Sequence, residues 1–290
     1  MMKKTGILTD SHSGITQEEA KKLGIYVLPM PFYINDQCHY EGKDISREEF
    51  IELLKNDENV STSQPSPEAV MNLWDEILKE YEELVYIPIS SGLSGSCSTA
   101  TAMAQNDDYE GKVFVVDNGR VSTPMKQSVL DAIELLNEGC SAKEIKNRLE
   151  DAKGKMGIFV AVDDLKYLKK GGRISSSVAL VGGMLKVKPI LKFDIGTLDS
   201  FKNCRGLIKA KTVMIEEVKR IVTTDYAEDF EKGNVHILAA SSADEEETKK
   251  WVNEIQEAFP GIKVLWDYLP MGITCHIGPG GLGIGYSVRP

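Results

Sequence analysis

The sequence lacks any closely spaced pair of cysteines. Its five cysteines lie far apart, and no Cys-x-x-Cys pair occurs: they are Cys38, Cys97, Cys140, Cys204 and Cys275. Zinc ribbons and disulfide frameworks need short, regular cysteine spacings. The four histidines are scattered as well. The sequence therefore predicts buried structural cysteines, no metal site and no cofactor.

Long apolar runs are also missing. No apolar stretch approaches the ~20 residues that cross a bilayer as a helix. The first residues, MMKKTGILTDSHSG, contain an apolar run that is too short for the core of a signal peptide. We therefore expect a cytoplasmic protein.

Positive charge is in deficit. The chain has 34 lysines and arginines against 44 aspartates and glutamates, a formal net charge of −10. Most of such a surface repels nucleic acid and anionic membranes. One stretch reverses the balance, because residues 165–192 hold six lysines and one arginine but no acid. This stretch is either a solvated face whose acids come from elsewhere in the chain, or a docking surface for a partner or a membrane.

Short apolar segments alternate with amphipathic segments in the first half of the chain. Helices are expected after the capping residues Thr16, Ser46 and Ser66. The expected strands are TGILTD, YVLPMPFYI, LVYIPI and KVFVVD. This alternation favours a mostly parallel α/β sheet.

The second half mixes α/β units with a predicted hairpin over residues 187–203. We therefore predict an α/β protein with two lobes: an N-terminal mostly parallel sheet domain over residues 1–155 and a C-terminal α/β domain with a hairpin over residues 156–290. Ligands favour clefts between lobes and the carboxyl ends of parallel strands, so the ligand is expected between the two domains.

The turn ISSGLSGSCSTA, residues 89–100, joins an apolar strand to a helix and is rich in serine and glycine. A nucleotide P-loop needs G-x-x-x-x-G-K-[ST], and here Gly92 and Gly95 are too close and no lysine follows. The nucleophile elbow of α/β hydrolases needs G-x-S-x-G, and Ser96 replaces its second glycine. A serine hydrolase using Ser94 remains an alternative.

Asp10 follows the first strand and offers a second enzymatic alternative. A phosphoaspartate enzyme of the haloacid-dehalogenase type needs another Asp two residues later, where this chain has His12. A phosphotransferase using Asp10 remains open, but the residue pattern favours Asp10 as an acceptor for backbone N–H groups of its loop.

A carboxylate site agrees best with the serine-rich turn. A helix start offers free N–H groups and the positive end of the helix dipole, and serine hydroxyls add donors without charge. A second hydroxyl-rich loop, VSTSQPSPE at residues 60–68, also precedes a helix. The two loops are expected to converge on one anion.

Five segments, taken together, resemble the motif set of a known family. They are TDS, TSQPSP, SSGLSGS, LKKGGRIS and HIGPGGLGIG, which occur in family order along nearly the whole chain. The sequence is similar to the DegV family of bacterial fatty-acid-binding proteins, some of which are the acyl-carrying subunit of a fatty-acid kinase. The resemblance implies that Thr62 and Ser94 bind the fatty-acid carboxylate, that the Gly95 backbone assists, and that His276 lies near it through a polar network.

The resemblance also implies which residues contact a partner and where the acyl chain lies. The basic residues Lys169, Lys170 and Arg173 would meet a kinase, and the acyl chain would enter the second domain along residues 178–187 and the hairpin. The expected protein has no catalytic residue. It binds a long-chain fatty acid such as palmitate, for lipid transport or fatty-acid metabolism, and presents it to a fatty-acid kinase. Transient membrane contact through the basic stretch is the other partner hypothesis.

Overall fold

The computed structural model describes residues 3–174, 187–193, 196 and 198–290. The chain divides into two compact units. Unit 1 comprises residues 1–46, 59–153 and 290, and unit 2 comprises residues 47–58 and 154–289. Within the described residues, no helix is long and apolar enough to span a membrane.

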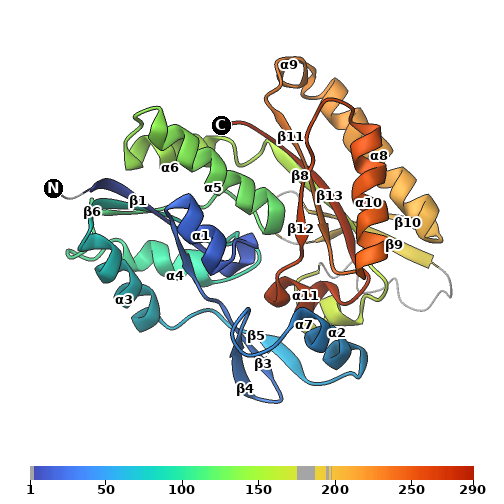
Figure 1. Cartoon of the computed structure of the whole chain (residues 1–290), viewed down its shortest axis with the longest axis horizontal. Helices are drawn as coiled ribbons and strands as arrows, with labels where there is room; N and C mark the ends of the chain where they lie inside the picture. Colours follow the sequence, from blue (N-terminus) through green and yellow to red (C-terminus); the bar gives the residue numbers. More distant parts are fainter. Residues whose placement is uncertain (1–2, 175–186, 194–195, 197) are drawn as a thin grey trace. The chain divides into compact units, whose positions relative to one another are not determined.

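A four-stranded sheet forms the centre of unit 1 (Figure 1). Its order is β2-β1-β6-β7, and every neighbouring pair is parallel. The strands are β1 (Lys3–Asp10), β2 (Tyr26–Leu28), β6 (Tyr81–Ile87) and β7 (Val113–Val115). The mostly parallel α/β sheet predicted for the first half of the chain is therefore confirmed.

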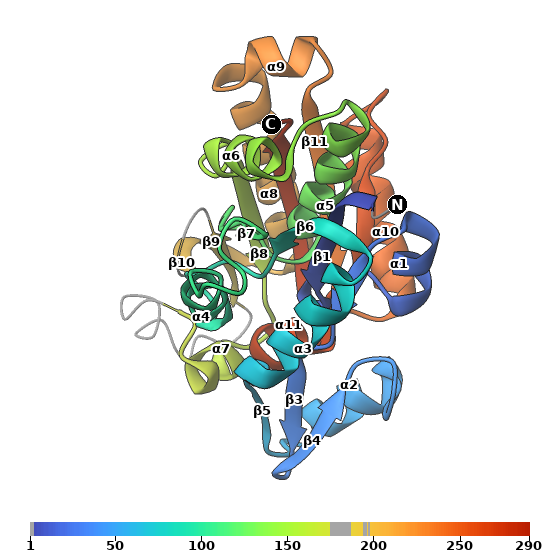
Figure 2. The same ribbon diagram turned by 90° about the vertical axis from the view of Figure 1, so that its left-hand side faces the viewer.

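Helices cover both faces of this sheet because apolar side chains alternate along its strands. Ile7 and Val85 point into a core shared with α1 (Gln17–Leu23), α5 (Ser122–Asn137) and α6 (Ala142–Asp151). Leu8 and Leu84 point into the opposite core, which is shared with α3 (Pro67–Leu78) and α4 (Ser96–Met103). A short 3-10 helix, η1 (Ser11–Ser13), follows β1. Helices α5 and α6 lie side by side (Figures 1 and 2).

Unit 1 also contains a small antiparallel sheet, which the sequence patterns did not predict. Its order is β4-β3-β5, with β3 (Pro31–Ile34), β4 (Gln37–Tyr40) and β5 (Val60–Thr62). The segment YVLPMPFYI was predicted as one strand interrupted by proline. The prediction of one strand is wrong, because β2 ends before Pro29, which lacks a backbone donor, and β3 belongs to another sheet. A turn with positive φ at Asn35 (48°) and Asp36 (65°) then makes the hairpin.

Unit 2 is built on a six-stranded sheet of order β10-β9-β8-β13-β11-β12. Only the β11–β12 pair is parallel, and the others are antiparallel. The strands are β8 (Met156–Ala161), β9 (Val187–Phe193), β10 (Asp199–Arg205), β11 (Val235–Ser241), β12 (Leu265–Tyr268) and β13 (Leu282–Val288). The predicted hairpin is the antiparallel β9–β10 pair.

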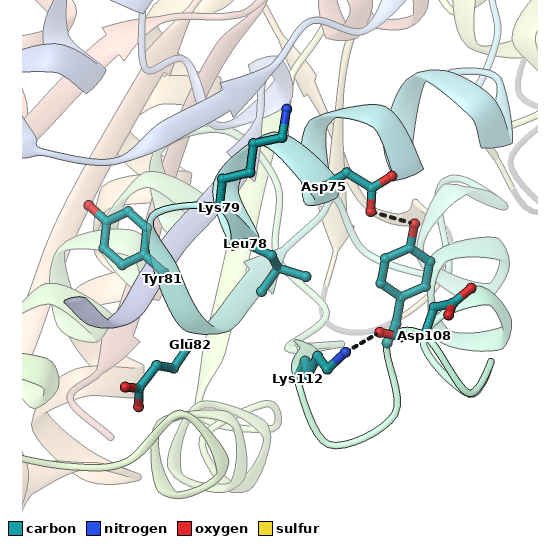
Figure 3. A pocket seen from close by; sticks show the side chains of 8 residues that line it. Asp75, Leu78, Lys79, Tyr81, Glu82, Asp108 and Lys112 are labelled. Carbon is teal, nitrogen blue, oxygen red and sulfur yellow. Dashed lines mark hydrogen bonds between the residues drawn. The ribbon is translucent and has the colours of Figure 1, made fainter. Parts of the chain in front are cut away.

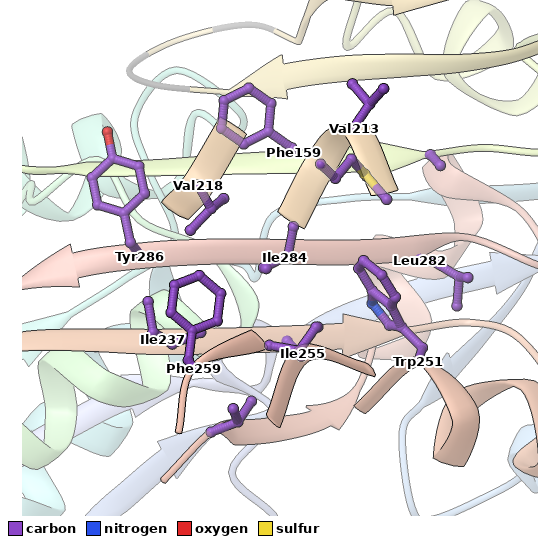
Figure 4. Close-up of a cluster of buried hydrophobic side chains, with 14 of the residues drawn as sticks. Phe159, Val213, Val218, Ile237, Trp251, Ile255, Phe259, Leu282, Ile284 and Tyr286 are labelled. Carbon is purple, nitrogen blue, oxygen red and sulfur yellow. The ribbon is translucent and has the colours of Figure 1, made fainter. Parts of the chain in front are cut away.

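Two helices pack their apolar sides against one face of this sheet: α8 (Leu207–Thr224) and α10 (Glu245–Ala258). Figure 4 shows Trp251 of α10 close to Leu282 and Ile284 of β13. The remaining helices of unit 2 are α2 (Arg47–Lys55), α7 (Lys166–Gly171), α9 (Ala227–Glu231) and α11 (Met271–Ile277). Helix α2 groups with unit 2, and not with the N-terminal part of the chain, because it contacts α11.

Candidate functional site

The serine-rich turn lies at the carboxyl end of β6 and leads into α4. The backbone N–H groups of Leu93 and Ser94 both donate to the Ser90 carbonyl, at 3.0 and 3.2 Å. The Ser94 hydroxyl accepts from the Ser96 N–H at 3.3 Å and donates to Ser96 Oγ at 3.1 Å. Ser94 is half-buried, and Gly95 is exposed at the start of α4. Ser94 thus places a hydroxyl beside the N-terminus of a helix.

The loop that carries Thr62 contacts this turn. Thr62 ends β5 and pairs with Phe32 of β3. Two residues later, Gln64 Oε1 accepts a hydrogen bond from Thr99 Oγ1 of α4 at 3.4 Å. A Cβ placed on Gly95 would lie 3.1 Å from the same oxygen. The structure therefore brings the two hydroxyl-rich loops together through Gln64, a residue that sequence reasoning did not select, although it stands inside the TSQPSP motif.

Asp10 is fully buried and has a structural role. Its Oδ1 accepts from the His12 N–H at 2.9 Å, and its Oδ2 accepts from the Ile89 N–H at 2.8 Å. Both carboxylate oxygens are therefore engaged by backbone donors. The interpretation of Asp10 as an acceptor for loop N–H groups is confirmed.

His276 belongs to unit 2, where it lies in α11. Its ring packs directly on Gly171, because a Cβ on that glycine would lie 2.0 Å from His276 Nδ1. The loop that follows α11 is held by Ser242, whose hydroxyl donates to the Gly278 carbonyl at 2.6 Å and accepts from the Gly281 N–H at 2.9 Å. No sequence motif pointed to Ser242, because it lies 36 residues before the loop that it holds.

Acids from outside the basic stretch pair with two of its lysines. Lys166 forms an ion pair with Asp57 at 2.5 Å, and Lys188 forms one with Asp163 at 2.6 Å. Part of the stretch is therefore a solvated face whose acids come from outside it. Lys169 and Lys170 on α7 are exposed.

Arg173 follows the end of α7 and is half-buried. Its guanidinium donates to the Gly171 carbonyl at 2.5 Å, at the end of α7 that packs on His276. Of the predicted acyl-chain segment, residues 178–186 lie outside the described residues.

Among the described residues, no group of three or more His, Cys, Asp or Glu side chains could hold a metal ion.

A surface pocket of about 580 Å³ lies in unit 1 near the start of β6, at the end of the strand opposite the serine-rich turn (Figure 3). Tyr109 donates to Asp75 at 2.9 Å across its wall, and Lys112 donates to the Asp108 carbonyl at 2.9 Å. None of the predicted site residues lines this pocket. The serine-rich turn remains the better candidate site.

Comparison with known proteins identifies the family. The sequence model of a protein family, described as "Uncharacterised protein, DegV family", matches residues 4–289. The chain belongs to the DegV family. This DegV-family chain is 32% identical to Protein DegV of Bacillus subtilis over 284 residues, covering 96% of this chain and 97% of that one.

Solved DegV structures share this fold. "Fatty Acid Binding of a DegV family Protein from Thermus thermophilus" superposes with a TM-score of 0.84 at 28% identity, covering 98% of this chain and 99% of that one. "Crystal Structure of DegV, a fatty acid binding protein from Bacillus subtilis" superposes with a TM-score of 0.83 at 28% identity, covering 99% and 100%. The predicted two-lobed α/β fold and the resemblance to DegV proteins are therefore both confirmed.

Proposed function

We propose that this protein binds a long-chain fatty acid, such as palmitate, and has no catalytic residue of its own. In this proposal the hydroxyls of Thr62 and Ser94 and the backbone of Gly95 hold the carboxylate, and His276 adds to the polar surroundings. Two structural relatives that are described as fatty-acid-binding proteins support it. The observation that carries it is the contact of Gln64 with Gly95 and Thr99, which joins the two hydroxyl-rich loops.

The energetics assign different tasks to the head group and the tail. A fatty-acid carboxylate, with an ordinary pKa of about 4.3, is charged at neutral pH. Hydrogen bonds to a charged group are worth about 1.5–3 kcal/mol each, and these mainly offset the desolvation of the carboxylate. Each buried methylene contributes about 0.8 kcal/mol, less the cost of association. The head group therefore sets orientation, and the tail supplies most of the affinity.

Mass spectrometry of the purified protein tests the proposal directly. After denaturation and organic extraction, protein from a bacterial host should release a co-purified fatty acid in near-stoichiometric amount. Delipidated protein should then bind added palmitate. A lipid-free preparation that also fails to bind palmitate would overturn the proposal. Labelling of Ser94 by a fluorophosphonate would instead favour the serine hydrolase alternative.

Paired substitutions test the head-group residues. Thr62→Val combined with Ser94→Ala should weaken palmitate binding by about tenfold or more, which corresponds to one or two lost hydrogen bonds. The thermal unfolding midpoint should hardly change, because Thr62 and Ser94 are only half-buried. Ser98→Ala, at an exposed serine of the neighbouring helix α4, is the matched control. Equal effects of the control and the double variant would remove Thr62 and Ser94 from the site.

We further propose that Lys169, Lys170 and Arg173 form a docking surface for a fatty-acid kinase. The supporting observation is that Lys169 and Lys170 are both exposed on the same short helix, α7. Replacement of both exposed lysines by glutamate, and separately Arg173→Ala, should weaken kinase binding in a pull-down, with Lys249→Glu on α10 as control. Loss of binding to anionic vesicles without loss of kinase binding would favour membrane contact. If these substitutions change neither kinase binding nor vesicle binding, Lys169, Lys170 and Arg173 do not form a docking surface.

A further inference from the structure

The first part of the serine-rich turn, residues 89–91, is fixed by hydrogen bonds to residues at the ends of both neighbouring strands. Three consecutive backbone N–H groups donate to acceptors outside the turn: Ile89 to Asp10 Oδ2 at 2.8 Å, Ser90 to the Arg120 carbonyl at 2.9 Å, and Ser91 to Asp117 Oδ1 at 3.3 Å. Asp10 ends β1, and the other two acceptors follow β7. Since β6 lies between β1 and β7 in the sheet, the turn is fixed on both sides.

Asp117 makes the most extensive of these contacts. Besides accepting from the Ser91 N–H, it accepts from the Ser91 hydroxyl, with Ser91 Oγ 2.6 Å from Asp117 Oδ2. Ser91 itself is exposed, so burial does not hold it in place. The bidentate contact with Asp117 therefore restrains a part of the turn that packing leaves free.

The restraint extends to Ser94 through Ser90. The Ser90 N–H is bound to the loop that carries Asp117 and Arg120, and the Ser90 carbonyl accepts from the N–H groups of Leu93 and Ser94. Ser90 is buried. A shift of the backbone at Ser90 and Ser91 would move the Ser90 carbonyl. The N–H groups of Leu93 and Ser94 that bind this carbonyl would move with it, and so would the Ser94 hydroxyl.

Asp117 is itself anchored by α6 and the segment that follows it. Lys153 Nζ lies 2.8 Å from Asp117 Oδ2, and the Asp117 N–H donates to Glu150 Oε1 at 3.0 Å. Glu150 in turn pairs with Lys146 at 2.6 Å. The cation of Lys153 also compensates the negative charge of Asp117, which would otherwise disfavour a second carboxylate near the turn.

We propose that Asp117 is a positioning residue for Ser94 in the carboxylate site, acting through Ser91 and Ser90 without touching the ligand. This inference rests on the proposed fatty-acid-binding function. It predicts that Asp117 contributes to palmitate binding only as long as the Ser94 hydroxyl is present to be positioned.

A double-mutant cycle with palmitate tests this dependence. The four proteins are the wild type, Ser94→Ala, Asp117→Ala and the double variant, each delipidated before titration. Asp117→Ala should weaken palmitate binding about tenfold in the wild-type background and less than about twofold in the Ser94→Ala background. Asp75→Ala is the matched control, because Asp75 bonds Tyr109 near the opposite end of β6 (Figure 3), and it should leave binding unchanged.

Each outcome decides a different question. The same fold-loss in both backgrounds, or no loss in either, would overturn the positioning role of Asp117. If Asp117→Ala does not fold, Ser91→Ala replaces it in the cycle, because it removes the 2.6 Å hydrogen bond from an exposed side chain and should show the same dependence on Ser94. Failure of the wild type to bind palmitate would instead overturn the proposed function itself.

Discussion

The carboxylate of Asp10 accepts a hydrogen bond from the backbone N–H of Ile89, 79 residues further along the chain, at 2.8 Å. The same carboxylate also binds the His12 N–H at 2.9 Å. One buried side chain thus connects the end of β1 with the start of the serine-rich turn. The candidate site therefore depends on residues that need not touch a ligand.

Asp10→Ala should lower the free energy of unfolding by about 2–6 kcal/mol, because it leaves two N–H groups in a buried loop without their acceptor, at about 1–3 kcal/mol each. Urea denaturation measures the loss. Asp107→Ala, at an exposed position, is the control and should have little effect. If the two variants had the same stability, the capping role of Asp10 would be wrong.

Asp131→Ala should destabilise the protein by about 3–5 kcal/mol, since it leaves the buried Arg120 without its counter-charge. Arg120 Nη1 lies 3.8 Å from Asp131 Oδ2, and neither side chain is more than 1% exposed. Burial lowers the pKa of Arg120 to about 10, although Asp131 acts in the opposite direction.

Adding Arg120→Met to Asp131→Ala should recover part of the lost stability, because the uncompensated charge is then gone. Urea denaturation of the wild type, the two single variants and the double variant gives four unfolding free energies. Their difference is the coupling energy between Arg120 and Asp131. Glu228→Ala breaks the surface ion pair with Lys232 and should cause no measurable loss. Additive effects of the two buried substitutions would contradict the pairing.

Gly171→Ala should displace the His276 ring, because the new Cβ would lie 2.0 Å from Nδ1. We expect a changed imidazole resonance in the NMR spectrum and a stability loss of about 1–3 kcal/mol from overpacking. Gly154→Ala adds the same methyl group where nothing lies within 4 Å, and should leave both unchanged. An unaltered His276 resonance in the Gly171 variant would refute the contact.

Asp117 should make stability depend on pH in the acidic range. Burial alone would raise its pKa, but hydrogen bonds from Lys153 and Ser91 outweigh burial and hold the pKa below the ordinary value. A carboxyl group with a lowered folded-state pKa stabilises the protein above its unfolded pKa of about 3.9, and this stabilisation is lost as the pH falls through the folded pKa.

The difference in unfolding midpoint between the wild type and Asp117→Asn should therefore be full at pH 6 and shrink below pH ~4. Thermal unfolding at several pH values measures it. A difference that stays constant down to the lowest pH at which both proteins fold would show that the charge of Asp117 is not involved.

Local patterns predicted the elements that depend on local chemistry. Thr16 and Ser66 cap α1 and α3 as expected, because a cap needs only the side-chain oxygen and an N–H three residues later. The hairpin β9–β10 also agrees with the predicted pattern, and the glycine pair that follows LKYLKK predicts the end of α7, which is capped by Gly172. Continuous apolar runs located β1, β6 and β7 of the parallel sheet, because such strands are covered by helices on both faces.

Sequence patterns failed where contacts with distant segments decide the local structure. The amphipathic pattern of residues 211–230 predicts one long helix, but α8 ends at Thr224 and a separate helix, α9, begins at Ala227. Residues 60–62, predicted as a loop, form β5 because β3 offers an antiparallel partner. A single sequence carries no record of such pairings, because strand partners are selected by the whole fold.

The sequence by itself determined the alternation of strands and helices, the two-lobed α/β class and the motifs that carry the family, because these depend on local periodicity and spacing. Only the tertiary structure decided that Gln64 meets Gly95, that Asp10 caps Ile89 and that Asp117 holds Ser91. These contacts join segments that are between 26 and 79 residues apart. Their partners are set by which strands lie side by side, and strand order is a property of the folded sheet.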